Sequence, residues 1–184
     1  MEIFVIRHGI TPLNKQDKVN GEIDEPLAPE GREQAESAAS SIPSAVSHIY
    51  SSPLLRARQT ANIIGSIRAI PVTYSDAISE TRMGSIAGLS WEEMENGQEL
   101  KRRHRSVEFD YRPYGEESVE DVKDRLMPFA REIRELHRDQ GILLVSHGGI
   151  IRLLQLLESG TSTPETIQHA SLLTFDLNKI LLTP

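Results

Sequence analysis

Two short apolar runs that each end at a histidine constrain the fold of this chain most. Residues 3–6 form a continuous apolar run, rich in β-branched side chains, that stops at Arg7 and His8. Residues 142–145 form a second run, and the sequence Ser-His-Gly-Gly follows it at residues 146–149. Such runs indicate strands that are buried on both faces. Because open α/β sheets bind ligands beyond the carboxyl ends of their strands, both histidines stand where such a sheet binds a ligand.

Apolar and amphipathic segments indicate the other elements. Helices are expected over residues 29–41, 53–67 and 118–138 and after residue 149, and weaker strands over residues 47–51, 71–74 and 172–177. The alternation of strands and helices predicts an α/β fold with a mostly parallel, mixed sheet and helices on both faces. The length of 184 residues suits one domain over residues 1–184.

Three short patterns predict where helices begin or bend. Residues 51–53, Ser-Ser-Pro, predict a cap and a first-turn proline for the helix at residues 53–67. Ser118 and Asp121 predict a capping box at the start of the longest helix. Pro128 lies inside the apolar stripe of that helix, so a kink or a break is expected there.

Residues 84–117 form the least regular part of the chain. They contain Trp91, a basic run at residues 101–105 and a loop segment at residues 113–117. We expect an insertion of helix and loop that lies over the strand ends. Two interpretations stay open, a lid over the binding pocket and a solvated helical excursion.

The composition excludes several classes of protein. The chain has no cysteine, which excludes thiol catalysis, cysteine-based zinc sites and disulfide scaffolds. Its net charge of −7 argues against nonspecific nucleic-acid binding, and the basic run lacks interleaved aromatic side chains. No apolar run approaches the roughly 20 residues that cross a bilayer. The N-terminus lacks the basic segment of a signal peptide, so a cytoplasmic location is expected.

Arg7, His8 and Gly9 are the first candidates for chemistry. An imidazole becomes a nucleophile when a hydrogen bond holds one ring nitrogen as N–H and the other nitrogen keeps its lone pair. Gly9 removes a Cβ that would crowd a ligand, and Arg7 offers a planar fork of donors that matches phosphate oxygens. The pattern therefore suggests that His8 attacks an anionic electrophile. The alternative is a strand that ends in a solvent-facing arginine–histidine pair.

Two further segments favour binding of an anion. Arg56 lies near the N-terminus of the helix at residues 53–67, where the helix dipole attracts anions. Arg58 points about 200° away from Arg56 around the helix, so we expect it at the surface. His147 and Gly148 form a tight turn between strand and helix, whose N–H groups can point at a ligand. The alternative for His147 is a core histidine beside a glycine turn.

The motifs also occur in an order that is similar to one known family. The matching residues are Arg7-His8-Gly9 with Thr11 and Asn14; Gly21, Asp24, Pro26 and Leu27; Gly31, Gln34 and Ala35; residues 51–60; residues 115–118; and Ser146-His147-Gly148. This set resembles the histidine phosphatase superfamily, which includes the cofactor-dependent phosphoglycerate mutases. The resemblance extends from about residue 2 to residue 177, and it implies the phosphoglycerate mutase-like form of the α/β fold.

The resemblance implies a role for each matching residue. His8 would be the phosphorylated nucleophile, through the ring nitrogen that is not bonded to the backbone. Glu80 would donate a proton and then act as a base; among 27 acidic residues only the resemblance singles it out. The phosphate site would consist of Arg7, Asn14, Gly21, Arg56, His147 and Gly148. No metal and no organic cofactor is implied, and the partner would be a small-molecule phosphate ester.

Several departures from the family pattern bear on the expected activity. Ile86 and Ala87 stand where a tryptophan and a glutamate are common, which leaves the shape of the pocket near Glu80 open. Ala28 stands where a serine or threonine cap is common, a loss worth about 1 kcal/mol of helix stability. Thr81 stands where mutases commonly carry an arginine for the substrate carboxylate. Together with the short chain, Thr81 favours a phosphatase that transfers the phosphoryl group to water.

Three alternatives remain beside the phosphatase. A phosphoglycerate mutase is one, because Arg102 and Arg103 match a paired arginine that mutases use in the corresponding insertion. A metal hydrolase could use His8, Glu80 and His147 as ligands, although two nearby arginines would repel a cation. A non-catalytic module that binds phosphate ligands is the third. The substrate and the oligomeric state are left open by the sequence.

Overall fold

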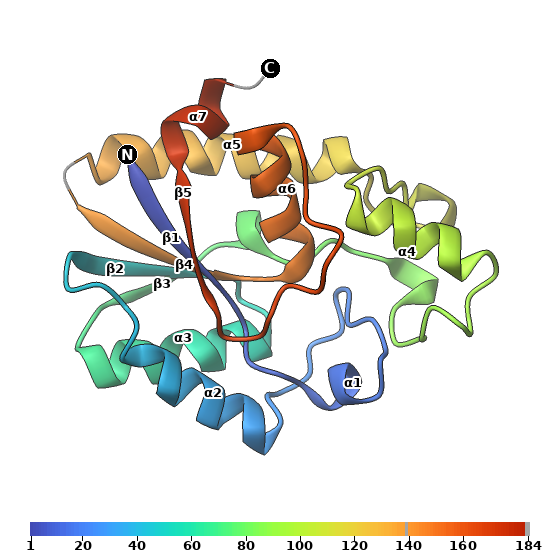
Figure 1. The fold of residues 1–184 in the computed structure, drawn as a ribbon, viewed down its shortest axis with the longest axis horizontal. Helices are drawn as coiled ribbons and strands as arrows, with labels where there is room; N and C mark the ends of the chain where they lie inside the picture. The colour runs from blue at the N-terminus through green and yellow to red at the C-terminus, as the bar shows by residue number, and fades with distance from the viewer. Residues whose placement is uncertain (139, 183–184) are drawn as a thin grey trace.

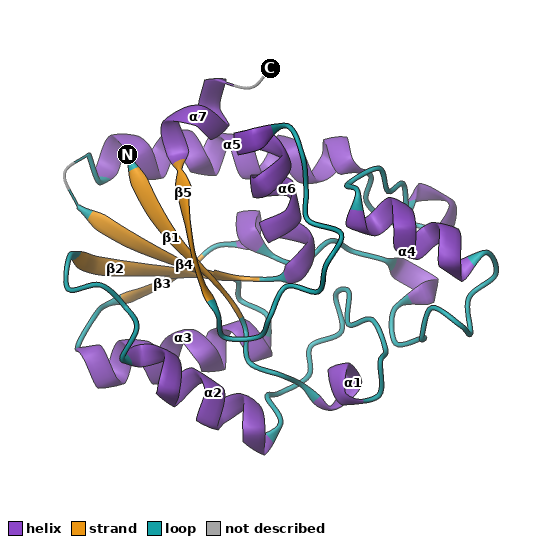
Figure 2. Ribbon diagram, viewed as in Figure 1, coloured by secondary structure: helices purple, strands orange, loops and turns teal. Residues whose placement is uncertain are grey.

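A twisted β-sheet forms the centre of the molecule. The computed structural model describes residues 1–138 and 140–182. In that part of the chain the strands are β1 (Glu2–Arg7), β2 (Val46–Ser51), β3 (Val72–Tyr74), β4 (Gly141–Ser146) and β5 (Leu172–Asp176). They lie in the order β3-β2-β4-β1-β5, with β5 antiparallel to β1 and the other neighbours parallel. The predicted mixed, mostly parallel sheet is confirmed (Figure 2).

Helices cover both faces of this sheet, as predicted. Figure 1 shows α2 (Pro29–Ala39) and α3 (Leu55–Arg68) on one face and α5 (Val119–Leu136), α6 (Gly148–Ser159) and α7 (Leu177–Leu182) on the other. Alternate residues of the central strands enter opposite cores: Val5 and Leu144 pack toward α5 and α6, and Ile6 and Val145 toward α2 and α3. This burial on both faces explains the continuous apolar runs.

The central strands β1 and β4 end side by side. Arg7 of β1 is the register partner of Ser146 of β4, and the N–H of His8 donates to the carbonyl of Ser146 at 3.0 Å. The residues that follow both strands, His8 and His147, therefore start from the same edge of the sheet.

The longest helix begins as predicted but is not interrupted where a break was expected. The Ser118 hydroxyl accepts from the N–H of Asp121 at 3.3 Å, and the Asp121 carboxylate accepts from the N–H of Ser118 at 2.8 Å, which forms the capping box. α5 then continues through Pro128 to Leu136, so of the expected kink or break, the break is wrong. Pro128 removes one backbone hydrogen bond, while the buried apolar stripe on both sides of it keeps the helix packed.

The predicted cap of α3 is also wrong. The helix begins at Leu55 rather than at Pro53, and no side chain of the preceding residue caps it. The Asp24 carboxylate, from the loop that precedes α2, instead accepts from the N–H of Leu55 at 2.5 Å. Ser52 accepts only from the N–H of Leu54, at 3.2 Å. α2 likewise lacks a side-chain cap at Ala28, as expected from the sequence.

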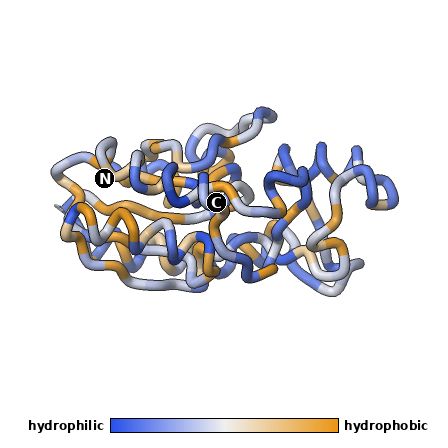
Figure 3. The backbone as a smooth tube through the Cα atoms, turned by 90° about the horizontal axis from the view of Figure 1, so that it is seen from below, coloured by the Kyte–Doolittle hydropathy of each residue, from blue (hydrophilic) through white to orange (hydrophobic). Residues whose placement is uncertain are grey.

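The irregular segment at residues 84–117 contains one α-helix, α4 (Gly97–Arg105), and two short 3-10 helices, Gly84–Ile86 and Arg112–Tyr114. Figure 1 shows α4 and the short α1 (Pro12–Lys15) beyond the carboxyl ends of the strands. The residues around α4 are largely hydrophilic, whereas the residues of the sheet are largely apolar (Figure 3). Among the described residues, no helix combines the length and the apolar character needed to cross a membrane.

Candidate active site

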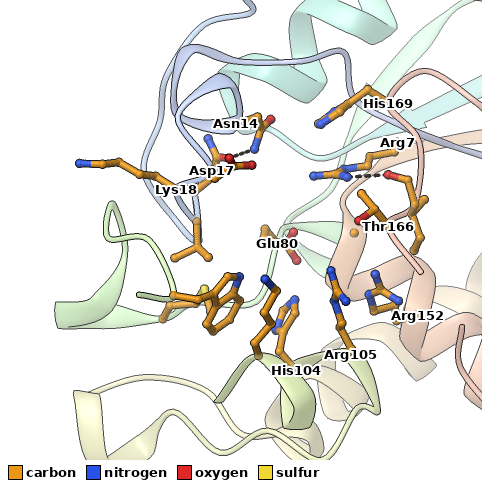
Figure 4. A pocket seen from close by; sticks show the side chains of 18 of the residues that line it. Arg7, Asn14, Asp17, Lys18, Glu80, His104, Arg105, Arg152, Thr166 and His169 are labelled. Atoms are coloured by element: carbon orange, nitrogen blue, oxygen red, sulfur yellow. Dashed lines mark hydrogen bonds between the residues drawn. The ribbon is translucent and has the colours of Figure 1, made fainter. Parts of the chain in front are cut away.

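A cavity of about 500 Å3 opens at the carboxyl edge of the sheet. Five parts of the chain line it: the end of β1 with the residues after it, the loop that contains Glu80, the segment that contains Trp91 and α4, the start of α6, and the loop before β5. Figure 4 shows Arg7, Glu80 and His169 from three different parts of the chain around the same space. The cavity thus lies where the two apolar strand runs predicted a ligand site.

His8 is held in a single tautomer at the base of the site. Its side chain is 2 % exposed, and its Nδ1 lies 2.7 Å from the carbonyl oxygen of Gly9. Because a carbonyl oxygen only accepts, Nδ1 carries the hydrogen and the lone pair of the neutral ring is on Nε2. The Nε–H of Arg56 lies 3.2 Å from Nε2. One ring nitrogen is therefore bonded to the backbone and the other faces a cation, which is the arrangement expected of a nucleophilic histidine.

Burial keeps the imidazole of His8 uncharged. Burial first, and then the positive charges of Arg56 and Arg7 together with His147 and His169, lower the pKa of His8 well below its usual value. A neutral ring retains the lone pair that an attack on phosphorus requires.

Arg56 is fully buried at the start of α3, and hydrogen bonds to His8 and to two main-chain carbonyl groups fix its guanidinium group. Its Nη1 donates to the carbonyl of Ile23 at 2.7 Å, and its Nη2 donates to the carbonyl of Gly21 at 2.8 Å. The predicted residue Gly21 lines the cavity and contacts Arg56 through its carbonyl group. Burial lowers the pKa of Arg56, while Glu80 and the other nearby carboxylates raise it. Arg58 is exposed, as predicted.

Arg7 and His147 carry buried nitrogen atoms that no described residue satisfies. Arg7 donates through Nη1 to the carbonyl of Ile167 at 2.6 Å, but its Nε has no partner. Both ring nitrogens of the fully buried His147 are also unpartnered, and the ring lies 5.1 Å from that of His8. Burial lowers the pKa of His147 well below its usual value and that of Arg7 to about 10. Buried polar atoms of this kind are satisfied when an oxyanion binds.

Glu80 reaches the site from the loop that follows the 3-10 helix Asp76–Ile78. Its carboxylate accepts from the N–H of Thr81 at 2.9 Å and from the N–H of Gly149 at 3.2 Å, at the N-terminus of α6. A Cβ on Gly149 would lie 2.5 Å from Oε1 of Glu80, so this approach requires glycine. Asn14 and Gly148 line the same cavity as Glu80. The structure therefore brings all the residues predicted for the site together.

Polar side chains from α2 and α3 hold the loop that follows His8. The Thr60 hydroxyl accepts from the N–H of Gly9 at 3.1 Å, and the amide oxygen of Gln34 accepts from the N–H of Ile10 at 2.9 Å. Gly31 lets α2 approach this loop, because a Cβ there would lie 2.2 Å from the carbonyl oxygen of Ile10. The matching residues outside the cavity therefore position the backbone of the nucleophile.

Sequence reasoning did not single out His169, Arg152 or Arg105 for the site. His169 donates from Nδ1 to the carbonyl of His8 at 2.9 Å. Arg152 of α6 and Arg105 of α4 line the cavity. The one local signal was a buried arginine within the apolar stripe of α6, where Arg152 is 6 % exposed. No local signal distinguishes Arg105 or His169, because their roles depend on side-chain direction.

The paired arginine of the insertion points away from the cavity. Arg102 is exposed and forms ion pairs with Glu99 and Glu108, and Arg103 donates to the carbonyl of Glu108. The same helix presents Lys101, His104 and Arg105 to the cavity instead. The segment therefore lies over the site, as predicted. The predicted match of Arg102 and Arg103 to a substrate-binding pair is not supported by their positions.

The described residues contain no group of three or more His, Asp or Glu side chains that could hold a metal ion. His8, Glu80 and His147 lie around one cavity but do not form such a group. The geometry of the donor groups therefore does not support the metal-hydrolase alternative.

Comparison with known proteins identifies the family. The model of the histidine phosphatase superfamily (branch 1) matches residues 3–180. The chain belongs to this superfamily. The resemblance inferred from the strand ends, the glycines and the arginines is thereby confirmed.

Relatives within the histidine phosphatase superfamily include both phosphatases and mutase-like proteins. Phosphoglycerate mutase-like protein 4 of Arabidopsis thaliana is 34% identical over 83% of this chain and 69% of its own length. The metal-independent phosphoserine phosphatase of Arabidopsis thaliana is 32% identical over 92% of this chain and 74% of its own length. The solved structure of a mycobacterial glucosyl-3-phosphoglycerate phosphatase in complex with VO3 matches with a TM-score of 0.82 and 28% identity, over 94% of this chain and 91% of that chain. The predicted phosphoglycerate mutase-like α/β fold is thereby confirmed.

Proposed function

We propose that the protein hydrolyses phosphate monoesters through a phosphohistidine formed on His8. The observation that carries the proposal is the tautomer of His8, whose Nδ1 donates to Gly9 and whose Nε2 lone pair lies beside Arg56. Nε2 attacks phosphorus, the bond between phosphorus and the ester oxygen breaks, and the phosphoryl group passes to the ring. Arg56 stabilises the negative charge on the phosphoryl oxygens during this transfer.

Glu80 supplies the protons that the two steps need. Its carboxyl group donates a proton to the departing alkoxide in the first step. In the second step the resulting carboxylate accepts a proton from water, water attacks phosphorus, and inorganic phosphate leaves His8. The Glu80 carboxylate contacts the N–H of Gly149, two residues after His147, and Glu80 lines the same cavity as His8, which supports this assignment.

The remaining polar groups bind the phosphoryl oxygens in this proposal. The unpartnered Nε of Arg7 and one N–H of neutral His147 donate to them. The N–H of Gly148, at the start of α6, and the amide of Asn14 assist from the rim of the cavity. This set needs neither a metal nor an organic cofactor for phosphoryl transfer.

Transfer to water is favoured over transfer between positions of a phosphoglycerate. Thr81 stands at the position after the acid, and Arg102 and Arg103 point away from the cavity. The relatives named for phosphoserine and for glucosyl-3-phosphoglycerate support a small-molecule ester as the substrate. A phosphoglycerate mutase is the second candidate, because another relative carries the name mutase-like.

Release of inorganic phosphate from a panel of monoesters tests the proposal. We expect release by the wild-type protein in the presence of a chelator, and a nearly complete loss in His8→Ala. Equal release by both proteins would contradict the role of His8. Interconversion of 2- and 3-phosphoglycerate without phosphate release would instead identify a mutase, and neither activity would favour a binding module.

A further inference from the structure

The wall of the cavity formed by α4 and α6 carries positive charges that form no ion pair with a carboxylate of the described residues. Lys101, Arg105 and Arg152 all line the cavity. Among the ion pairs of the described residues, none includes any of these three. The protein as a whole has a net charge of −7, so carboxylates are abundant in the chain but absent as partners here. Such a concentration of cations in a cleft attracts an anionic ligand.

Arg152 is built rigidly into this wall. It is 6 % exposed and donates from Nη2 to the carbonyl of Glu165 at 2.5 Å and from Nη1 to the carbonyl of Thr163. Carbonyl groups fix the plane of the guanidinium group but carry no negative charge, and the Glu80 carboxylate acts on Arg152 only from a distance, without an ion pair. Fixing a buried arginine without an ion pair is costly unless a ligand supplies the negative charge.

Arg105 lies beside Arg152 and has no hydrogen-bond partner for its side chain among the described residues. Figure 4 shows the two guanidinium groups next to each other, on the side of the cavity opposite Asn14 and Lys18. Burial first, and then the charge of Arg105, lower the pKa of Arg152 to about 10, while the charge of Glu80 raises it; the effect of Arg105 agrees with this closeness. Like charges that face one cavity repel each other, and an anion between them removes the repulsion.

The pair is continuous with the proposed phosphate site. Arg7, Arg152 and Arg105 line the same cavity, and the charge of Arg152 lowers the pKa of Arg7, which agrees with this arrangement. Gly148 and Arg152 both belong to α6 and are about 6 Å apart along its axis. A cavity of about 500 Å3 accommodates a small molecule. A second anion on Arg105 and Arg152 would therefore be joined to the phosphate by a short linker.

We propose that Arg105 and Arg152 form a subsite for a second anionic group, a carboxylate or a phosphate, on the leaving-alcohol part of the substrate. The inference rests on the proposed function in that the ester phosphate occupies the site of His8. The substrate class is a small phosphate monoester with two anionic ends. Lys101 lies on the same helix as Arg105 and adds positive charge near the mouth of the subsite.

Matched ligand pairs test the subsite by binding alone. Calorimetric titration of His8→Ala, which lacks the nucleophile, compares 3-phosphoglycerate with glycerol 3-phosphate and fructose 1,6-bisphosphate with fructose 6-phosphate. We expect the ligand with the second anion to bind about 10- to 100-fold more tightly in at least one pair, because charge-assisted hydrogen bonds are strong. The first pair detects a carboxylate and the second detects a phosphate. Equal affinities within both pairs would overturn the inference.

Substitutions on α4 then assign the effect to Arg105. In the His8→Ala background, Arg105→Gln should reduce the affinity ratio of the responsive pair by about 10-fold or more, and Arg105→Lys should retain part of it. Arg102→Gln is the matched control, because Arg102 lies on the same helix but is exposed and paired with Glu99 and Glu108. Arg152→Gln should act like Arg105→Gln, with thermal melting as the check that the loop before β5 stays folded. A ratio that Arg105→Gln leaves unchanged would overturn the inference.

Hydrolysis of 4-nitrophenyl phosphate, which has no second anion, separates this inference from the proposed function. If the wild-type protein hydrolyses none of the esters but His8→Ala still discriminates within a pair, the hydrolase proposal fails and the subsite stands. If 4-nitrophenyl phosphate and both members of each pair are hydrolysed with equal kcat/KM, the hydrolase proposal stands and the subsite fails.

Discussion

The orientation of the side chains of His8 and Arg56 depends on a small number of main-chain carbonyl groups. The Gly9 carbonyl sets the tautomer of His8, and the carbonyls of Gly21 and Ile23 orient Arg56, whose Nε donates to Nε2 of His8. These carbonyl acceptors are all main-chain atoms, so the geometry does not depend on the rotamer of another side chain. A nucleophile positioned in this way is organised before the substrate arrives.

Replacement of the acid tests the role of Glu80 at this scale. We expect Glu80→Gln to slow the hydrolysis of esters with poor leaving groups by about 10²- to 10⁴-fold, because their alkoxides need a proton. Esters with good leaving groups, such as 4-nitrophenyl phosphate, should be slowed less in the first step. Steady-state kinetics across a series of leaving groups measures this difference. An equal loss for all leaving groups would remove Glu80 from the role of the acid.

At the scale of elements, the end of β4, the proposed acid Glu80 and the proposed phosphate site all meet at the start of α6. The N–H of Gly149 holds the Glu80 carboxylate, and the space that a Cβ would fill at this position is occupied by Oε1 of Glu80 and the hydroxyl of Thr81. The position of the acid is therefore set by a glycine in the first turn of the helix.

Gly149→Ala tests this dependence. The added Cβ would lie 2.5 Å from Oε1 of Glu80 and should displace the carboxylate. A displacement of about 1 Å is expected to lower kcat for poor leaving groups by roughly 100-fold. Gly148→Ala is the steric comparison, because its Cβ would meet Arg7 at an ordinary 3.8 Å and its effect should be smaller. Equal activities of the Gly149→Ala variant and the wild-type protein would contradict this account of the acid's position.

Much of this arrangement of elements follows from the sequence, and the exceptions have physical causes. Strand ends are local features, so Arg7, His8 and His147 were identified from the residues around them. Glu80 follows no such pattern, and only the family resemblance selected it. The cap of α3 was mispredicted because it comes from Asp24, which is 31 residues away along the chain. The meeting of Arg105 with Arg152 likewise depends on packing between α4 and α6 that no local pattern reports.

At the scale of the whole molecule, two buried histidines, His8 and His147, and two half-buried histidines, His104 and His169, are neutral in the folded protein, which affects its stability in acid. Burial lowers the pKa of His104 and of His169 to about 3, and the pKa values of His8 and His147 are also well below the usual value. In the unfolded chain these rings accept protons near pH 6.5. Below that pH the unfolded state binds more protons than the folded state, so stability decreases as the pH is lowered.

Denaturation in urea at several pH values measures this effect. Above about pH 7, we expect these histidines to leave the free energy of unfolding unchanged. Between about pH 6.5 and pH 3 the free energy of unfolding should decrease, by up to about 1.4 kcal/mol per pH unit for each histidine. His104→Gln should make the slope shallower by about that amount. Nδ1 of His104 lies 2.9 Å from the hydroxyl oxygen of Tyr111, and comparing the stabilities of variant and wild type at pH 8 measures the loss of this contact separately. A slope that does not change in His104→Gln would contradict the half-buried, neutral state of His104.

The central claim, that His8 carries the phosphoryl group, is tested most directly by trapping the intermediate. The protein would be mixed with a hydrolysed ester, denatured rapidly in base, where phosphohistidine survives, and digested for mass spectrometry of the peptide that contains His8. We predict phosphorylation on His8 in the wild-type protein, a larger phosphorylated fraction in Glu80→Gln with a good leaving group, and none in His8→Ala. Continued hydrolysis by the wild-type protein with no phosphorylation at His8 at any quench time would contradict the account.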